Sequence, residues 1–357
     1  LSPLIGGELE RGNYEMEFAM TTPANVYSDT ISEFCAATEA TALCDTSNVG
    51  RLKATGDDTL DLLNRMSTNQ VLNLEPGQGA STILTTDRGR ILDLIAVVNL
   101  GDYVLLLTSP GEQQTVIDWL DRYTIMEELT IADITGDTAL LTVFGPTSPD
   151  KLEPVVGVQL AQLTPYHTLA CTIAGHQAQV INRPQGQLPS FDLLLSPDAV
   201  PNVWQNLIDS GITPIGTAAY EAARVKHAIP VYGREIGDAY NPLEAGLIGS
   251  IDFHKGCYIG QEVIARLDTY QKIQKRLVML RFSPDAVVSA GAILQHEGQA
   301  VGTVTSASET PTTGDLIGLG YVRTASATVA NRLELAESAS GWAEIESLPQ
   351  LFGPGEG

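Results

Sequence analysis

The sequence predicts an α+β fold followed by a small β-barrel, and two observations support this. Short apolar strands, turns and helices recur in two similar units up to about residue 275, whereas only short alternating strands and polar turns follow. In each unit an apolar strand ending in Ser-Pro precedes a helix that contains a tryptophan, Trp119 or Trp204. We therefore expect two ferredoxin-like α+β subdomains, each a sheet with helices on one face, plus the barrel.

Hydrophobic periodicity and turn residues place the elements of the first unit. Asp57 or Asp58 is a typical helix N-cap, and Asp87-Arg88-Gly89 is typical of a hairpin turn. The elements expected here, in chain order, are a helix at 30–43, a strand at 49–54, a helix at 56–66, strands at 81–87, 90–100 and 103–108, a helix at 111–122, and strands at 129–134 and 139–143.

The second unit repeats this order and leads into the barrel. Its expected elements are strands at 171–174, 177–182 and 191–195 and helices at 200–208 and 217–228, followed by barrel strands at 277–282, 292–296, 300–305 and 316–322. The resulting division is a first region at 1–135, a second at 136–275, a barrel at 276–330 and a loose polar tail at 331–357. The N-terminal segment is allotted to either the first or the second region.

Composition argues for a folded chain without membrane spans. Of the 357 residues 43% are hydrophobic, but no run of 18 apolar residues occurs. The N-terminus has no basic region followed by an apolar core, so we expect a cytoplasmic compartment. No CxxC pair is present, which predicts free thiols and no metal site built from local ligands. The four cysteines are Cys35, Cys44, Cys171 and Cys257.

Charge is distributed unevenly. The net charge of −23 disfavours binding to nucleic acid or to anionic membranes. Nine of the twenty Lys and Arg residues nevertheless lie between Arg224 and Arg281, with only six acids. This cationic segment favours a small anionic ligand, and a locally balanced surface is the alternative. The P-loop, GxGxxG and HExxH patterns are all absent.

The segment His254–Leu277 concentrates the reactive groups of the chain. Cys257 stands between two glycines, Gly256 and Gly260, and Lys255 precedes it. Nearby cations lower the pKa of a thiol and expose thiolate at neutral pH. A buried cysteine that packs as a small hydrophobe is the competing interpretation.

Two carboxylates also stand in apolar surroundings. Asp93 lies in a strand whose two faces are both apolar, where a carboxylate is costly to bury without a donor. It is either a structural anchor or a ligand group in a cavity. Glu244 follows an Asn-Pro turn and precedes Ala-Gly-Leu. It is either a ligand group or an acid that stabilises the start of a helix.

The stretch Lys255–Glu262 resembles the K-G-C-Y-x-G-Q-[DE] signature of the YgfZ-type folate-binding proteins, relatives of the T-protein (aminomethyltransferase) of the glycine cleavage system. The resemblance extends over about residues 20–325. The further elements that carry it are Thr68-Asn69-Gln70, the hairpin Arg88–Asp93, Asn241–Leu247 and Gly302–Ser306.

The resemblance implies three domains around a central hole that holds tetrahydrofolate or a one-carbon derivative. It also implies a monomer that supports iron–sulfur proteins or their assembly factors. Cys257 would be the functional thiol, and Asp93 would act in the cavity. The further folate contacts that it implies are Arg224, Tyr232, Glu244, Lys255, Tyr258, Gln261 and Arg266.

One position departs from the related T-protein pattern R-x-E-A-G-x-P-[LV]-Y-G. Lys226 stands where that pattern has a pterin-binding glutamate, and an ammonium cannot accept a hydrogen bond from a pterin. Another carboxylate, such as Glu244, could take its place. Two further hypotheses are a tetrahydrofolate-dependent aminomethyltransferase, with Asp93 as the folate-activating group, and a scaffold that no longer binds folate.

Overall fold

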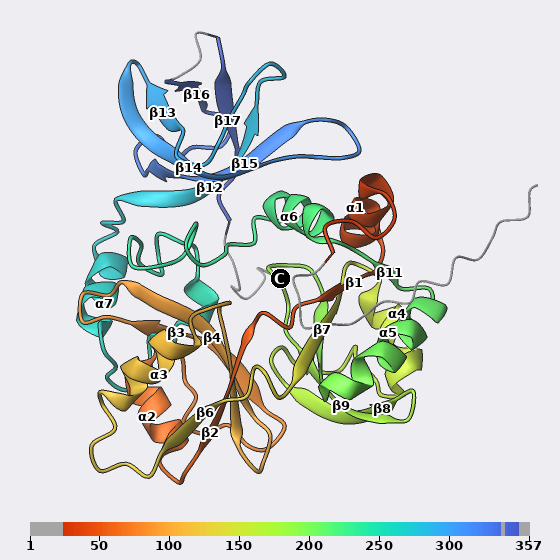
Figure 1. Ribbon diagram of the computed structural model, residues 1–357. Coiled ribbons are helices and arrows are strands. Elements are labelled where there is room, and N and C mark those ends of the chain that lie inside the picture. Colours follow the sequence, from red (N-terminus) through yellow and green to blue (C-terminus); the bar gives the residue numbers. More distant parts are fainter. Residues whose placement is uncertain (1–23, 337–339, 350–357) are drawn as a thin grey trace, which may run out of the picture.

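Two sheets and one barrel organise the computed structural model, which describes residues 24–336 and 340–349 (Figure 1). The predicted α+β fold with a C-terminal barrel is confirmed. Residues 1–23, 337–339 and 350–357, which include part of the predicted tail at 331–357, lie outside the described residues. Within the described part, no helix is long and apolar enough to cross a membrane.

The first sheet is antiparallel and has the strand order β3-β4-β5-β2-β6. Its apolar face is covered by α2 (Thr59–Met66) and α3 (Gln113–Asp121), where Leu62, Leu63 and Trp119 are buried. Its strands are β2 (Gly50–Thr55), β3 (Gly79–Thr85), β4 (Ile91–Asn99), β5 (Val104–Thr108) and β6 (Thr130–Asp133).

The second sheet has the strand order β11-β1-β7-β10-β9-β8. The helices α4 (Ser148–Val156) and α5 (Val200–Asp209) cover its outer face, and Trp204 of α5 is buried in the core that they form with the sheet. Its strands are β1 (Ala42–Asp45), β7 (Ala139–Phe144), β8 (Thr168–Ile173), β9 (His176–Asn182), β10 (Ser190–Leu195) and β11 (Thr213–Pro214). A short 3-10 turn, η1 (Pro197–Ala199), precedes α5.

The two sheets pack against each other through their inner faces. Leu105 and Leu107 of the first sheet contact the cluster formed by Leu140, Ile181 and Leu194 of the second. Each sheet is therefore covered on both sides, by helices and by the other sheet. This explains why their central strands are apolar on both faces, a pattern otherwise typical of parallel sheets.

Three helices depart from the sequence prediction. The helix expected at 30–43 ends earlier, as α1 (Thr30–Glu39), and β1 then joins the second sheet by pairing with β7 and β11. The N-terminal segment thus belongs with the second unit. The helix α4 is absent from the sequence prediction. It contains two prolines, of which Pro149 lies in the first turn, where no amide donor is needed. The helix α7 (Gln261–Thr269) lies inside the motif segment.

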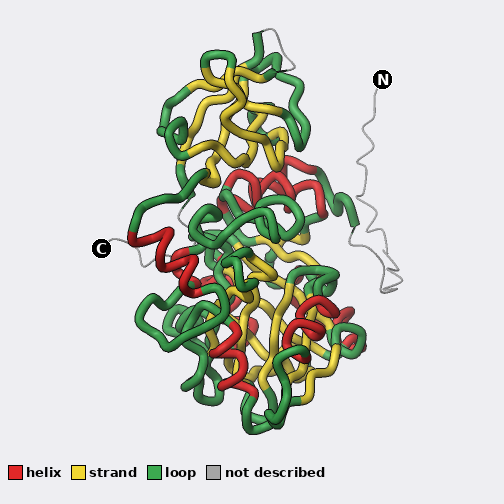
Figure 2. The backbone as a smooth tube through the Cα atoms, turned by 90° about the vertical axis from the view of Figure 1, so that its left-hand side faces the viewer, coloured by secondary structure: helices red, strands yellow, loops and turns green. Residues whose placement is uncertain are grey.

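The barrel closes with six strands in the order β12-β15-β14-β13-β16-β17. Figure 2 shows it as the strand-rich unit at the top of the molecule. The strands expected at 277–282, 292–296, 300–305 and 316–322 are present as β12 (Lys275–Phe282), β13 (Ile293–His296), β14 (Gln299–Glu309) and β15 (Leu316–Arg323). The prediction of a loose tail from residue 331 is wrong for β16 (Arg332–Leu335) and β17 (Trp342–Ser347). Alternate small or apolar residues of these strands, such as Leu333 and Ile345, are buried in the barrel, a signal hidden by their many acids.

The barrel is fixed to the rest of the chain through α6 (Thr217–Lys226) and the segment 229–251. The Arg224 guanidinium of α6 donates to Ser306 Oγ of β14 at 2.7 Å, and that hydroxyl donates to Glu235 at 2.6 Å. The Tyr321 hydroxyl of β15 donates to the Glu235 carbonyl at 2.7 Å. A 3-10 turn, η2 (Ile248–Ser250), ends this segment.

Candidate functional site

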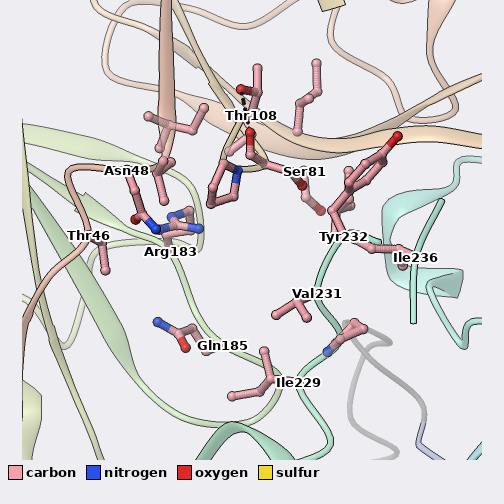
Figure 3. A pocket seen from close by; sticks show the side chains of 18 of the residues that line it. Thr46, Asn48, Ser81, Thr108, Arg183, Gln185, Ile229, Val231, Tyr232 and Ile236 are labelled. Carbon is pink, nitrogen blue, oxygen red and sulfur yellow. Dashed lines mark hydrogen bonds between the residues drawn. The ribbon is translucent and has the colours of Figure 1, made fainter. Parts of the chain in front are cut away.

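A cavity of about 380 Å³ lies where the inner ends of the two sheets meet α6 and the segment 229–236 (Figure 3). Its volume falls in the range of small-molecule sites. The wall from the first sheet is largely apolar, with Leu94, Ala96 and Leu107, whereas the second sheet supplies polar groups. The lining residues labelled in Figure 3 are Thr46, Asn48, Ser81, Thr108, Arg183, Gln185, Ile229, Val231, Tyr232 and Ile236.

Asp93 is buried on β4 and is bonded to two residues that line the cavity. Its carboxylate accepts the backbone N–H of Leu94 and that of Ser109, each at 2.9 Å. Burial raises the pKa of Asp93 to about 7, and the hydrogen bonds from Ser109 and Leu94 partly oppose this shift. The group therefore changes its protonation state near neutral pH, as a general acid or base must.

Tyr232 is the second predicted residue at the cavity, which it lines directly. Its ring projects from the segment 229–236 toward the end of the first sheet (Figure 3). Burial raises the pKa of Tyr232, and the negative charges of Glu112 and Asp93 raise it further. The phenol thus stays protonated beside Asp93 and can donate a hydrogen bond.

Arg183 is a cavity residue that the sequence analysis did not identify. It follows β9, and its Nε donates to the fully buried carboxylate of Asp192 on β10. Asp192 also accepts the hydroxyl of Thr142 at 2.7 Å, and Thr142 lies 2.6 Å from the hydroxyl of Thr46. The sequence does contain a signal for this pair, because Asp192 lies inside the apolar run FDLLL and therefore requires a buried hydrogen-bond donor nearby.

The signature segment lies against α2 and the β3–β4 hairpin. The Lys255 ammonium donates to the carbonyls of Asn64, Ser67 and Asn69 at 2.7, 2.8 and 2.6 Å. Burial lowers the pKa of Lys255 to about 8. Since these carbonyls use its donors, Lys255 terminates α2 and holds the Thr68-Asn69-Gln70 element. Its ammonium donors are therefore not available for a folate contact, whereas its expected effect on the Cys257 thiol stays a prediction.

Cys257 is exposed in this segment, so the interpretation as a buried hydrophobe is wrong. The neighbouring Tyr258 is buried, and burial raises its pKa to about 12. Ile259 accepts a hydrogen bond from the Thr85 hydroxyl at 2.6 Å. The segment therefore presents a free thiol on a loop whose flanking residues are fixed.

The other predicted contacts lie away from the cavity. Arg224 is fully buried and forms ion pairs with Glu221 at 2.5 Å and Glu235 at 3.2 Å, so its guanidinium is not available to attract folate carboxylates. Glu244 is buried and lies 3.5 Å from the Arg90 guanidinium, near Lys275. Its pKa is raised by burial. Asp93 reaches the lining only through its bonds to Leu94 and Ser109. The other predicted residues that are not among the described lining residues of the cavity are Arg224, Glu244, Lys255, Cys257, Tyr258, Gln261 and Arg266.

Comparison with known families agrees with this architecture. A model of the GCVT N-terminal domain matches residues 9–255, and a model of the glycine cleavage T-protein C-terminal barrel domain matches residues 275–342. The chain belongs to the glycine cleavage T-protein family.

Relatives of this T-protein family member cover most of its length. An aminomethyltransferase of Symbiobacterium thermophilum is 30% identical over 94% of this chain and 92% of its own. A chloroplastic protein of Arabidopsis thaliana, whose name assigns it provisionally to the transferases, is 32% identical over 83% of this chain and 68% of its own. The crystal structure of the glycine cleavage system aminomethyltransferase T from Bartonella henselae shares the fold, with a TM-score of 0.78, 20% identity and 90% coverage of both chains.

Lys226 does not reach the cavity of this T-protein family member. It is exposed at the end of α6, and its ammonium lies 5.4 Å from the centre of the Phe34 ring on α1. Lys226, which stands where the T-protein pattern has a glutamate, therefore places no positive charge in the cavity. Asp45 is the carboxylate residue among the described lining residues.

Gly260 offers a test of how the signature segment is packed. Its φ is +84°, and a Cβ atom would lie 2.5 Å from the Thr86 carbonyl oxygen. We expect Gly260→Ala to lower the free energy of unfolding by about 2 kcal/mol or more, as urea denaturation would measure. Gly256→Ala is the control, because a Cβ there meets no atom within 4 Å. Equal stability of the two variants would contradict this packing.

Proposed function

We propose that the cavity binds tetrahydrofolate and that the protein transfers a one-carbon unit of the aminomethyl type to or from it. The observation that supports this is Asp93, a buried carboxyl group with a pKa of about 7 that is bonded to two lining residues. The aminomethyltransferase names of relatives that cover nine tenths of the chain support the reaction class.

Asp93 supplies the proton chemistry in this proposal. Because its pKa is raised to about 7, it can exchange a proton near neutral pH. Two of its lone pairs accept the N–H groups of Leu94 and Ser109, which fix the orientation of the carboxylate. An ionised carboxylate offers about four acceptor sites, so two remain after these bonds. Because Asp93 is fully buried and is not among the described lining residues, a local movement of the cavity wall is needed for a folate N–H group to reach them.

The apolar wall gives the ring of the folate a place to lie. Leu94, Ala96 and Leu107 form a surface suited to a flat heteroaromatic ring, and Tyr232 can donate to it from the opposite segment. Calorimetry with tetrahydrofolate, followed by an assay of methylenetetrahydrofolate formation from an aminomethylated lipoyl carrier, tests the proposal. Absence of binding at millimolar ligand would favour a scaffold that contacts only protein partners.

A second candidate function rests on Cys257. Its exposed thiol lies in the segment that resembles the YgfZ-type signature, whose family supports iron–sulfur enzymes. Cys44 and Cys171 are buried, and no group of three or more His, Cys, Asp or Glu side chains in the described part of the chain forms a metal site. A cluster held by Cys257 would therefore need ligands from a client or a second chain.

Cys257→Ser separates the two functions. If the thiol serves iron–sulfur enzymes, the variant is expected to restore less than a tenth of their activity in a deletion strain while its tetrahydrofolate affinity stays unchanged. The buried Cys171→Ser is a control for the general loss of a thiol. Full restoration by Cys257→Ser would remove this candidate, and robust methylenetetrahydrofolate formation would favour the transferase.

A further inference from the structure

The guanidinium of Arg183 is only partly used by the fold. Its Nε donates to Asp192, but no described residue accepts a hydrogen bond from either Nη group. The side chain is 23% exposed and lines the cavity, so its exposed part faces that space. Figure 3 shows Arg183 on the same wall as Asn48 and Gln185.

The residues behind Arg183 fix the direction in which it points. The Asp192 carboxylate is fully buried. One of its oxygens accepts a hydrogen bond from the Thr142 hydroxyl, and the other accepts one from the Arg183 Nε. The Arg183 backbone N–H also donates to the Ser190 carbonyl at 2.9 Å. A guanidinium held in this way presents its two Nη groups as a preorganised planar fork, which suits a pair of acceptor atoms in one plane.

We propose that Arg183 is the anchoring residue of the cavity and donates from both Nη groups to a planar pair of acceptor atoms on the bound ligand. This inference rests on the proposed binding of tetrahydrofolate. Two parts of that ligand offer such a pair, namely the oxo-bearing edge of the pterin ring and the carboxylates of the glutamate tail.

The surroundings favour the ring. Asp192 already neutralises the Arg183 charge, so the fork is better matched to neutral acceptors than to a full anion. The opposite wall, with Leu94, Ala96 and Leu107, is apolar and would stack on a ring rather than solvate a carboxylate. Gln185 accepts a hydrogen bond from the Tyr220 hydroxyl at 3.3 Å and donates one to the Ser190 hydroxyl at 3.4 Å, which leaves one amide N–H as a further donor.

Arg183→Lys tests the fork, because it retains the charge that Asp192 needs and removes the paired donors. We expect its dissociation constant for tetrahydrofolate to rise about 10- to 100-fold in calorimetry. Thr142→Val is the matched control: it removes a hydrogen bond from the same Asp192 at a residue that is not among the described lining residues, and it should change the affinity less than about threefold. An equal change in the two variants, or none in Arg183→Lys, overturns the inference.

Ligand analogues show which part of tetrahydrofolate supplies the acceptor atoms for Arg183. Because they are tested on the unaltered protein, they remain informative if Arg183→Lys does not fold. A 4-amino tetrahydropterin replaces the ring oxo acceptor by a donor, and an amidated tail removes the carboxylates. Weaker binding of the first supports the ring, and weaker binding of the second alone supports the tail. Unchanged affinity for both overturns the inference. If the unaltered protein binds no tetrahydrofolate, the proposed function itself fails.

Discussion

Arg224→Met is expected to lower the free energy of unfolding by about 3–5 kcal/mol, because it leaves the buried Glu235 carboxylate without its cation. Both side chains of this pair are fully buried. The same guanidinium bonds Ser306 of the barrel and the Ile229 carbonyl, so the loss also loosens the joint between α6 and the barrel. Urea denaturation followed by circular dichroism measures the effect.

Two further variants show whether the buried charge is the cause. Arg234→Met removes an exposed cation that pairs with Glu221, the other partner of Arg224, and should cost less than about 1 kcal/mol. Adding Glu235→Gln to Arg224→Met removes the unpaired carboxylate and should recover part of the lost stability. Similar stability of Arg224→Met and Arg234→Met would contradict the assignment.

Asp93→Asn is expected to lower the rate of one-carbon transfer by about 10²- to 10⁴-fold, the usual contribution of a general acid or base. The amide cannot exchange a proton near neutral pH, although it occupies the same space. The rate of methylenetetrahydrofolate formation measures this effect. An unchanged rate would exclude Asp93 from the chemistry, and a changed affinity with an unchanged rate would reduce its role to binding.

The same substitution should alter how stability depends on pH. Since burial raises the pKa of Asp93 from 3.8 to about 7, the folded state binds a proton more tightly than the unfolded chain. The contribution of Asp93 to the free energy of unfolding is complete below pH 4 and is lost as the pH rises to about 7. The free energy of unfolding changes by up to about 4 kcal/mol over this range. Asp93→Asn should remove this decline, whereas the exposed Asp102→Asn should retain it. Thermal unfolding between pH 4 and pH 8 measures both, and parallel curves would contradict the shifted pKa.

The local pattern of the sequence predicted most strands and helices because their apolar periodicity is strong. The strands β4, β5 and β10 and the helices α3 and α5 lie close to the expected ranges. Patterns diluted by acids or prolines were missed, as in β16, β17 and α4. There, burial of alternate small or apolar side chains in a closed barrel, or of one helix face on a sheet, outweighs a weak local preference.

The composition of the site could be predicted only in part from the sequence. Asp93 was identifiable because a carboxylate is costly to bury in an apolar strand without a donor, and Tyr232 followed from the family resemblance. Arg224 and Lys255 belong to the same cationic segment, but their charges are used inside the protein, by two glutamates and by three backbone carbonyls. Sequence spacing cannot show whether a cation is already paired.

The sequence by itself determined the fold class, the family and the presence of a distinctive segment around Cys257. Only the tertiary structure decided what that segment does locally: Lys255 fixes it to α2, the Cys257 thiol is exposed, and neither is among the described residues that line the cavity. The cavity is instead formed by Arg183, Tyr232 and the neighbours of Asp93. These groups are separated by up to about 140 residues along the chain and meet because the two sheets pack face to face, an arrangement set by burial of their inner faces.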